Sequence, residues 1–202
     1  MLEISELQRD YITEILNISM GSAASVLSEM VNEAVSLSIP EIDFLPRCDA
    51  AHKFDQINTV KMSGVTQRMS GAISGDALLI FPEEKTLTIV RALLGDTVPV
   101  ESLTEMEQEA MCEIGNIILN SVVSSVADIL KREIVSSLPH FIKGTGKEVF
   151  SVESNNHDDL VMFLKVDFGL ESQSINGYVT LMLNVDSLHD FLSQLDAQIN
   201  AI

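Results

Sequence analysis

The chain has 202 residues, and its 30 acidic and 12 basic side chains give a formal charge of −18. Hydrophobic residues make up 46% of it, which is ample for a packed core and excludes a disordered chain. The acids divide evenly between residues 1–101 and 102–202, so no part of the chain favours nucleic acid or an anionic membrane surface as a partner. We expect a soluble, cytoplasmic protein, because the longest apolar runs are far shorter than a membrane span and the first residues do not resemble a secretory signal.

The first half of the chain predicts a long helix followed by strands. Ser5 stands three residues before Gln8 in a capping-box pattern, which opens an amphipathic stretch reaching about Val31. Apolar and β-branched runs then predict three strands, at Val35–Pro40, Val60–Thr66 and Gly71–Phe81. A short helical pattern at Glu83–Leu94 closes this half.

The second half begins after Gly95–Ser102, whose composition is that of a linker. Thr104 and Glu107 repeat the capping-box pattern and open a helix that reaches about Lys131. Strands are predicted at Ile134–Pro139, Glu148–Val152, Leu160–Phe168 and Ile175–Leu183. A helix at Ser187–Ile199 ends the pattern.

The two halves match each other at a shift of 99 residues. The segment Glu14–Ile18 aligns with Glu113–Ile117, and Pro40 aligns with Pro139. We therefore predict one domain over residues 1–202 made of two repeats, about 1–98 and about 102–202. The predicted class is α+β, with a helix-strand-strand-strand-helix unit duplicated about a pseudo-two-fold axis and two long helices packed on a mostly antiparallel sheet.

One face of each long helix carries a similar set of polar and small residues. Positions three or four apart on a helix lie within about 60° of one another. The first helix aligns Asp10, Glu14, Asn17 and Gly21, and the second aligns Glu109, Glu113, Asn116 and Asn120. Apolar residues such as Leu7 and Ile18 fill the other faces. A Glu and an Asn on one helix are typical of a solvated face, and common descent of the halves would explain their repetition, but asparagine is a mediocre helix former, so two at matching mid-helix positions favour a function.

The spacing of these residues resembles that of a known family. An acid, three residues, Glu, two residues, Asn, twenty-two residues and Pro occur once as Asp10, Glu14, Asn17 and Pro40, and again as Glu109, Glu113, Asn116 and Pro139. This pattern, which covers most of the chain, resembles the CheC, CheX and FliY family of chemotaxis phosphatases, and two copies in about 200 residues are most similar to the CheC type. The chain departs from the family at Glu109, where relatives have Asp or Ser, and at Leu16, where many have Gly.

The resemblance implies a phosphatase that hydrolyses the aspartyl phosphate of the response regulator CheY. Glu14 and Glu113 would then pair with the regulator's active-site lysine, and Asn17 and Asn116 would orient the attacking water. A carboxamide suits this role, since it can accept a hydrogen bond from water while it donates another to a phosphoryl oxygen. The neighbouring positions that would contact the partner are Asp10, Gly21, Glu109 and Asn120. The resemblance also implies Mg²⁺ in the regulator, with no cofactor or metal in this chain, and CheD as a possible second partner.

Other readings of the sequence compete with this one. A non-catalytic adaptor that binds CheY or CheD would keep the docking face without hydrolysis, although it would have no need of two asparagines. The four histidines are scattered, so we expect no metal site. Cys48 and Cys112 lack metal-binding spacing, and we expect Cys112 to pack against the core instead of acting as a nucleophile. We expect a monomer.

Overall fold

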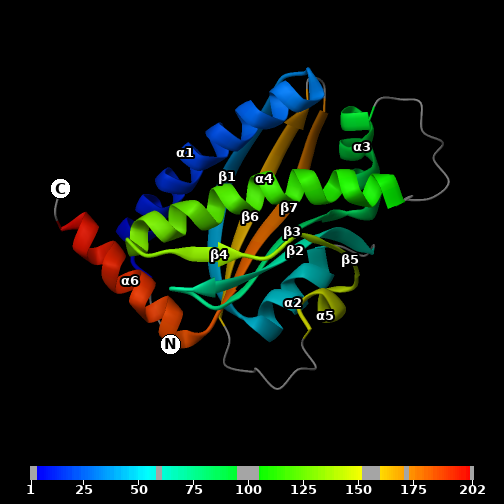
Figure 1. Ribbon diagram of the computed structural model, residues 1–202. Helices are drawn as coiled ribbons and strands as arrows, with labels where there is room; N and C mark the ends of the chain where they lie inside the picture. The colour runs from blue at the N-terminus through cyan, green and yellow to red at the C-terminus, as the bar shows by residue number, and fades with distance from the viewer. Residues whose placement is uncertain (1–3, 58–60, 95–104, 152–159, 171–172, 201–202) are drawn as a thin grey trace.

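The computed structural model describes residues 4–57, 61–94, 105–151, 160–170 and 173–200 (Figure 1). Its helices are α1 (Glu6–Val31), α2 (Arg47–Ile57), α3 (Glu83–Leu94), α4 (Glu105–Leu130), α5 (Gly146–Val149) and α6 (Val185–Ile199). Its strands are β1 (Val35–Pro46), β2 (Met62–Gly71), β3 (Gly75–Pro82), β4 (Ile134–Ser136), β5 (His140–Gly144), β6 (Leu160–Leu170) and β7 (Gln173–Leu183). The α+β class predicted from the sequence is confirmed.

All strands belong to one sheet of order β1-β6-β7-β3-β2-β4, with β5 also paired to β2, and every pair is antiparallel. The order interleaves the two halves of the chain. Strand β1 of the first half pairs with β6 of the second, while β4 and β5 of the second half pair with β2 of the first. The hairpins β2-β3 and β6-β7 meet at the centre through β3 and β7. Neither half therefore forms a sheet of its own.

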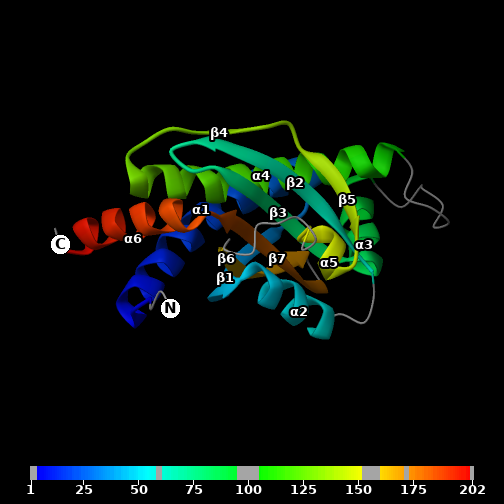
Figure 2. The same ribbon diagram turned by 90° about the horizontal axis from the view of Figure 1, so that it is seen from below.

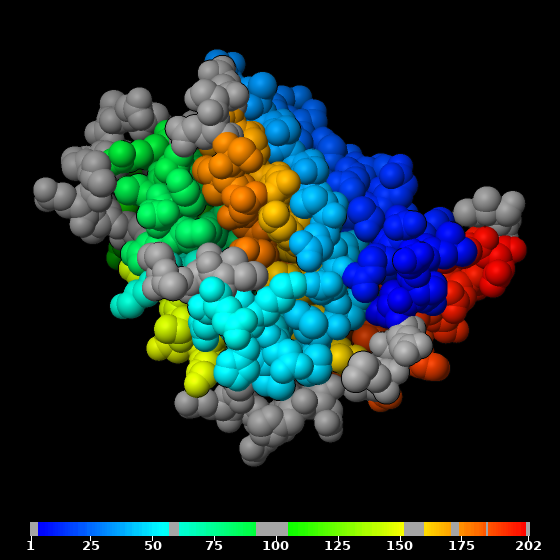
Figure 3. Space-filling view, turned by 180° about the vertical axis from the view of Figure 1, so that it is seen from behind, coloured from blue at the N-terminus to red at the C-terminus, as the bar shows by residue number. Residues whose placement is uncertain are grey.

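The two faces of the sheet are covered unequally. Helices α1 and α4 lie across one face with α3 and α6 beside them, and together with the sheet they enclose the larger core (Figures 1 and 2). Helices α2 and α5 cover part of the other face over a smaller core that includes Phe54 and Phe150. Seen from that side, β1, β6 and β7 reach the surface next to α2 (Figure 3). Helices α1 and α4, which carry the predicted site residues and are called the motif helices below, are thus held in place by packing around the larger core.

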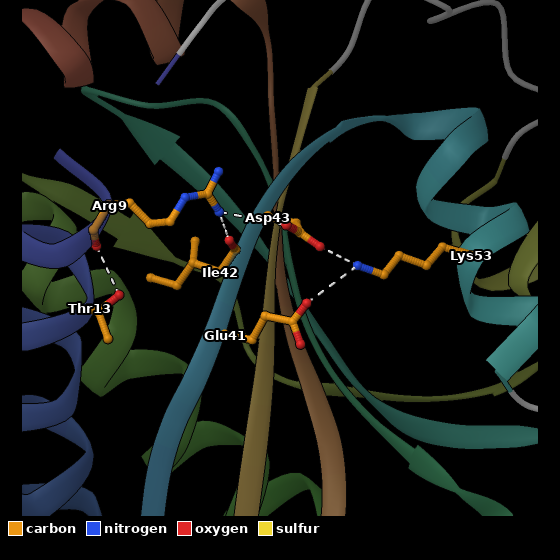
Figure 4. Close-up of polar contacts among 6 residues, drawn as sticks. All are labelled: Arg9, Thr13, Glu41, Ile42, Asp43 and Lys53. Carbon is orange, nitrogen blue, oxygen red and sulfur yellow. Dashed lines mark hydrogen bonds and ion pairs between the residues drawn. The ribbon is translucent and has the colours of Figure 1, made fainter. Parts of the chain in front are cut away.

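A polar network at the sheet edge ties the two helical layers together (Figure 4). Arg9 of α1 donates a hydrogen bond to the carbonyl of Ile42 and lies 3.6 Å from the carboxylate of Asp43. From the opposite side, Lys53 of α2 pairs with Asp43 and lies 3.9 Å from Glu41. Strand β1 is held between the two cations, so the network fixes the first turns of α1 against the edge of the sheet.

The helices predicted from the sequence are confirmed, and each half runs from a long helix through strands to a closing helix as predicted, but both halves contain more elements than the predicted unit. Each half contains a further helix, since α2 follows β1 in the first half and α5 follows β5 in the second. The strand predicted at Val35–Pro40 extends to Pro46, and the one predicted at Ile134–Pro139 stops at Ser136 and resumes at His140 as β5. Of the run predicted at Gly71–Phe81, only Gly75 onward continues as β3. The predicted linker, Thr104 and Val60 lie outside the described residues.

The strand predicted at Glu148–Val152 is wrong over its described residues, because Glu148 and Val149 form the end of α5, and Val152 lies outside the described residues. Thr145 caps this helix: its Oγ1 accepts a hydrogen bond from the backbone N–H of Glu148, and the Glu148 carboxylate accepts one from the N–H of Thr145 at 2.8 Å. The bond from the Thr145 backbone to the charged carboxylate lowers the pKa of Glu148. A capping box therefore decides the local structure, and the apolar pair Val149 and Phe150 is buried beside α2.

The apolar residues of α1 are less buried than their pattern predicts. Ile18 is 65% exposed and Leu7 is 62% exposed, so part of the apolar surface of α1 faces solvent. Helix α4 is long and apolar enough, by length and composition alone, to cross a membrane, but 56% of the qualifying window is buried inside the fold. That burial is what a core helix of a packed domain shows.

Candidate functional site

Helices α1 and α4 cross on the outer side of the larger core and touch each other. The capping box of Ser5 and Gln8 starts α1, with the Ser5 N–H donating to Gln8 Oε1 at 2.8 Å and the Gln8 N–H donating to Ser5 Oγ at 3.2 Å. The helix ends at Asn32, which adopts a left-handed conformation with φ 52°. Near the middle of α1, Ser19 Oγ contacts Ser125 Oγ of α4 in a hydrogen bond. Small side chains at this contact let the two helices approach closely.

The four predicted acids all point to solvent. Asp10 and Glu14 on α1 and Glu109 and Glu113 on α4 are exposed, and none of them forms an ion pair with another described residue. They remain available to a cationic group of a partner. Exposed carboxylates that stay hydrated at the rim of an interface avoid most of the cost of desolvation, and they attract and orient such a partner more than they raise its affinity.

Asn17 is half-buried and bonded to the first strand. The N–H of Ile39 donates to Asn17 Oδ1 at 2.8 Å, and Asn17 Nδ2 donates to the Ile39 carbonyl at 3.3 Å. Ile39 directly precedes Pro40, and the pairing of β1 with β6 shifts register at this point, between Ser38 and Glu41. Proline cannot donate to the ladder, so the break leaves the peptide of Ile39 free to bond to the helix.

Asn116 is also half-buried, but its partners are side chains. Its Oδ1 accepts one hydrogen bond from Gln67 Nε2 at 3.0 Å and another from Asn120 Nδ2 at 2.9 Å. Gln67, on β2, donates as well to the carbonyl of Ser137 at 3.1 Å. Among the described residues the Nδ2 group of Asn116 has no hydrogen-bond partner, so its N–H groups are free to bind a ligand.

A shallow groove of about 320 Å³ is formed by residues of α1 and α4. It is lined by Ser19, Ser22, Asn120, Ser121, Ser124, Ser125 and Asp128. Gly21, next to Ser22 in the sequence, is exposed, and the place where its Cβ would lie has no atom of another group within 4 Å. Of the predicted contact residues, Asn120 also holds Asn116 through a hydrogen bond. Gly21 has no side chain, so it leaves the surface of α1 open to a partner.

Two residues that hold the asparagines were not predicted from the sequence. Ile39 acts through its backbone, which no side-chain pattern reveals. Gln67 could have been noticed, because it is a polar residue between Val65 and Met69 on the inward face of an apolar strand, where it is 1% exposed. A buried glutamine needs hydrogen-bond partners for its amide, and one partner of Gln67 is the site residue Asn116.

Cys112 packs against the larger core, as the sequence predicts. Burial raises the pKa of its thiol, and the nearby charge of Glu113 raises it further. Such a thiol is mostly protonated at neutral pH and is a poor nucleophile. Among the described residues no group of three or more His, Cys, Asp or Glu side chains is placed to hold a metal ion.

The fold and the site together define a duplicated α+β protein whose two long helices present paired Glu and Asn residues. The chain belongs to the CheX family of chemotaxis phosphatases, because residues 63–163, half of its length, match the family model described as chemotaxis phosphatase CheX. That segment includes α4 with Glu113 and Asn116, as well as Gln67.

Two curated relatives carry phosphatase names. The CheY-P phosphatase CheC of Bacillus subtilis is 28% identical over 139 residues, which cover 67% of this chain and 66% of CheC. The flagellar motor switch phosphatase FliY of the same organism is 26% identical over 201 residues, covering 96% of this chain and 50% of FliY. The chain thus spans less than two thirds of the length of these two relatives.

Two solved structures share the fold. Thermotoga maritima FliY superposes with a TM-score of 0.78 at 19% identity, covering 97% of this chain and 99% of that one. CheX in the CheX–CheY–BeF₃–Mg²⁺ complex from Borrelia burgdorferi superposes with a TM-score of 0.52 at 18% identity, covering 85% and 96%. At such identities the likeness establishes the architecture and no more.

Proposed function

We propose that this protein is a phosphatase that hydrolyses the aspartyl phosphate of a CheY-like response regulator. The observation that carries the proposal is the placement of Glu14 and Asn17 on α1, and of Glu113 and Asn116 on α4, at the exposed surface of a chain that belongs to the CheX family. Two relatives named as CheY-P phosphatase and motor switch phosphatase support it. So does the fold shared with a CheX that was solved bound to CheY.

This hydrolysis depends more on the positioning of the attacking water than on a strong general base. The oxygen of a water molecule forms a bond to phosphorus, the bond from phosphorus to the aspartate oxygen breaks, and the products are inorganic phosphate and the aspartate carboxylate, with the water's proton passing to phosphate or solvent. Because the transition state is loose, an aligned water molecule supplies much of the acceleration. In our proposal Glu14 and Glu113 dock the regulator through its lysine, and Asn17 and Asn116 align the water.

The partner would supply the metal and the electrophile. In the proposal Mg²⁺ sits in the acidic pocket of the regulator next to the phosphoryl group, and this chain holds none. The even negative charge of this protein suits a partner whose contact surface is basic around that pocket, and such complementarity raises the rate of encounter more than the final affinity. Further parts of the proposal are a CheD-type second partner, which follows from the family resemblance, together with action as a monomer and a cytoplasmic location.

The decisive experiment measures the decay of a phosphorylated CheY with and without this protein. We expect acceleration by the intact chain and a loss of at least tenfold in the variant that carries both Asn17→Ala and Asn116→Ala, which corresponds to about 1.4 kcal/mol of barrier. Asn176→Ala is a matched control, because this asparagine on β7 is exposed and, among the residues that the structure describes, its side chain bonds only to Asp167.

The outcome separates the proposal from its rival. If the intact protein binds CheY but does not speed the decay, the chain is an adaptor and the enzyme proposal fails. If the double variant keeps full activity, the assignment of the asparagines fails while the activity stands.

A further inference from the structure

The two motif asparagines present different groups to a partner. A carboxamide has one edge on which an N–H and an oxygen lone pair lie side by side, and Asn17 turns this edge to the peptide of Ile39 through two hydrogen bonds. The N–H and the lone pair that remain point in opposite directions. To hold a water molecule and a phosphoryl oxygen together, Asn17 must first release Ile39, which is 1% exposed and anchored in the core.

Asn116 is arranged in the opposite way. Both hydrogen bonds to its Oδ1 come from inside the protein, from Gln67 and Asn120, and these use the two lone pairs of the oxygen. Both N–H groups of Nδ2 are therefore left for the outside. They can donate to a phosphoryl oxygen and to the oxygen of the attacking water without breaking any bond in the resting protein. Asn116 would therefore align the water as a hydrogen-bond donor, and not as the acceptor expected from the sequence.

Strand register explains why the two sites differ. Val166 of β6 lies opposite the register shift of β1. Its two neighbours, Lys165 and Asp167, pair with the residues on either side of that shift, Glu41 and Ser38. Gln67 of β2 is in the matching place, opposite the gap between β4 and β5. Val166 is fully buried and cannot reach an asparagine with a donor, whereas Gln67 has an amide there.

The gap between β4 and β5 completes the second arrangement. Where Ile39 points into the core, the corresponding Leu138 is 80% exposed, so the chain has turned outward at this point. The carbonyl of Ser137 then faces inward and accepts the second hydrogen bond of Gln67. Gln67 thus links Asn116 to the backbone carbonyl of Ser137. Asn17, in contrast, bonds directly to the backbone of Ile39.

We infer that Gln67 is a positioning residue for Asn116 and that the site on α4 turns over phosphorylated CheY faster than the site on α1. This rests on the proposed function. Gln67 lies beneath the site and touches no substrate, so it acts on the orientation of the Asn116 carboxamide. Its loss should lower kcat and leave docking through the exposed Glu113 as it is.

The test isolates each site with single-asparagine variants and follows CheY-P decay over a range of CheY-P concentrations. We expect Asn116→Ala to lower kcat tenfold or more, and Asn17→Ala to lower it less than threefold. In the Asn17→Ala background, Gln67→Leu and the isosteric Gln67→Glu should each lower kcat at least tenfold while KM stays within twofold. In the Asn116→Ala background the same changes should leave the residual rate as it was.

Thr180→Val is the matched control, since Thr180 is also a fully buried polar residue on a strand of the same sheet. It should keep the full kcat, and urea unfolding of all variants reports whether the fold is intact. The inference is overturned if Gln67→Leu and Gln67→Glu keep kcat, if they raise KM alone, if they slow both backgrounds equally, or if the two asparagine variants lose activity to the same extent. A wild-type protein with no phosphatase activity overturns the proposed function and this inference with it.

Discussion

Two glycines on the motif helices occupy opposite environments. A Cβ added to Gly115 would lie 2.6 Å from the Cβ of Val65 on β2, whereas a Cβ on Gly21 would meet no atom within 4 Å. Gly115 therefore lets α4 approach the sheet beside Asn116. At the matching position of α1, the fully buried side chain of Leu16 fills the space between helix and sheet. At Gly115 there is no such space, because α4 packs directly against Val65.

These environments predict effects of opposite sign on stability. Gly115→Ala should lower the free energy of unfolding by about 1–3 kcal/mol, because the new methyl group collides with Val65 in a packed core. Gly21→Ala should raise it by up to about 1 kcal/mol, because alanine is the better helix former at an open site. Urea unfolding followed by far-UV circular dichroism measures both, and a Gly115→Ala variant as stable as the wild type would contradict the packing.

Cys112 offers a chemical reporter next to the candidate site. Burial, and then the charge of Glu113, raise the pKa of its thiol. Removing that charge favours the thiolate, so Glu113→Gln should lower the pKa and speed alkylation by iodoacetamide modestly at a given pH, since burial is the larger cause. The rates are compared in a Cys48→Ser background so that a single thiol reacts. An unchanged rate in Glu113→Gln would show that the two groups do not interact.

Because the pKa of the Cys112 thiol is raised in the folded state, this group makes the free energy of unfolding fall at high pH. The folded state disfavours the Cys112 thiolate, so the contribution of this group is fully present below the ordinary thiol pKa and is lost as the pH rises through the higher folded value. At neutral pH the thiol is protonated in both states and has no such effect.

The motif residues could be predicted from the sequence, but the groups that hold them could not. Helical spacing alone places Glu14 near Asn17 and Glu113 near Asn116. The partners Ile39 and Gln67 come from strands, and which strand residue faces the helix depends on the pairing register, which a local pattern does not specify. The twenty-two residues from Asn17 to Pro40 have a physical meaning in the fold, since Asn17 bonds to the residue just before that proline.

At the scale of elements, the long and strongly amphipathic segments were predictable and the short ones were not. Helix α2 buries Ala50, Ala51 and Phe54, which is too little apolar surface to give a clear helical pattern. Helix α5 has only four residues, but Thr145 and Glu148 form a capping box that could have been recognised and that argues against a strand at Glu148. Tertiary contact between the two helices, through the Phe54 and Phe150 rings 5.6 Å apart, then stabilises both.

The network that joins α1 to α2 across β1 predicts unequal roles for two neighbouring acids. The side chain of Asp43 is 29% exposed and pairs with both Arg9 and Lys53, whereas that of Glu41 is 58% exposed and lies 3.9 Å from Lys53. Asp43→Ala should lower the free energy of unfolding by about 1–2 kcal/mol, because it leaves two cations without their shared partner. Glu41→Ala should change it by less than about 0.5 kcal/mol, as for most exposed ion pairs.

Thermal unfolding at low and high salt measures both variants. The difference between them should shrink in high salt, because salt screens the partly exposed charges. Equal losses in the two variants would show that Asp43 does not bridge the layers.

At the scale of the whole molecule, the duplication was visible in the sequence and the interleaving of the halves was not. A repeat can fold as two separate units or exchange strands, and the sequence pattern is the same for both. In the structure each half supplies the edge strand that covers the hairpin of the other, since β1 pairs with β6 and β2 with β4 and β5. The two motif helices also contact each other directly through Ser19 and Ser125.

Such interleaving predicts that the halves unfold together. The chain has two tyrosines and no tryptophan, and each half contains one tyrosine. Tyr11 is half-buried against the larger core, while Tyr178 is 7% exposed in the smaller core, with its ring 5.7 Å from that of Phe54. Tyr178→Phe therefore leaves a reporter in the first half and on one face of the sheet, and Tyr11→Phe leaves one in the second half and on the other face.

Because unfolding either half removes strands that the other half needs, the tyrosine fluorescence of each single-tyrosine variant should change at the same urea concentration as its far-UV circular dichroism. Each substitution shifts stability on its own, so fluorescence and dichroism are compared within one variant and not between the two. Two separated midpoints in the Tyr11→Phe variant would mean that the smaller core melts apart from the rest, and the sheet would then not act as one cooperative unit despite its shared strands.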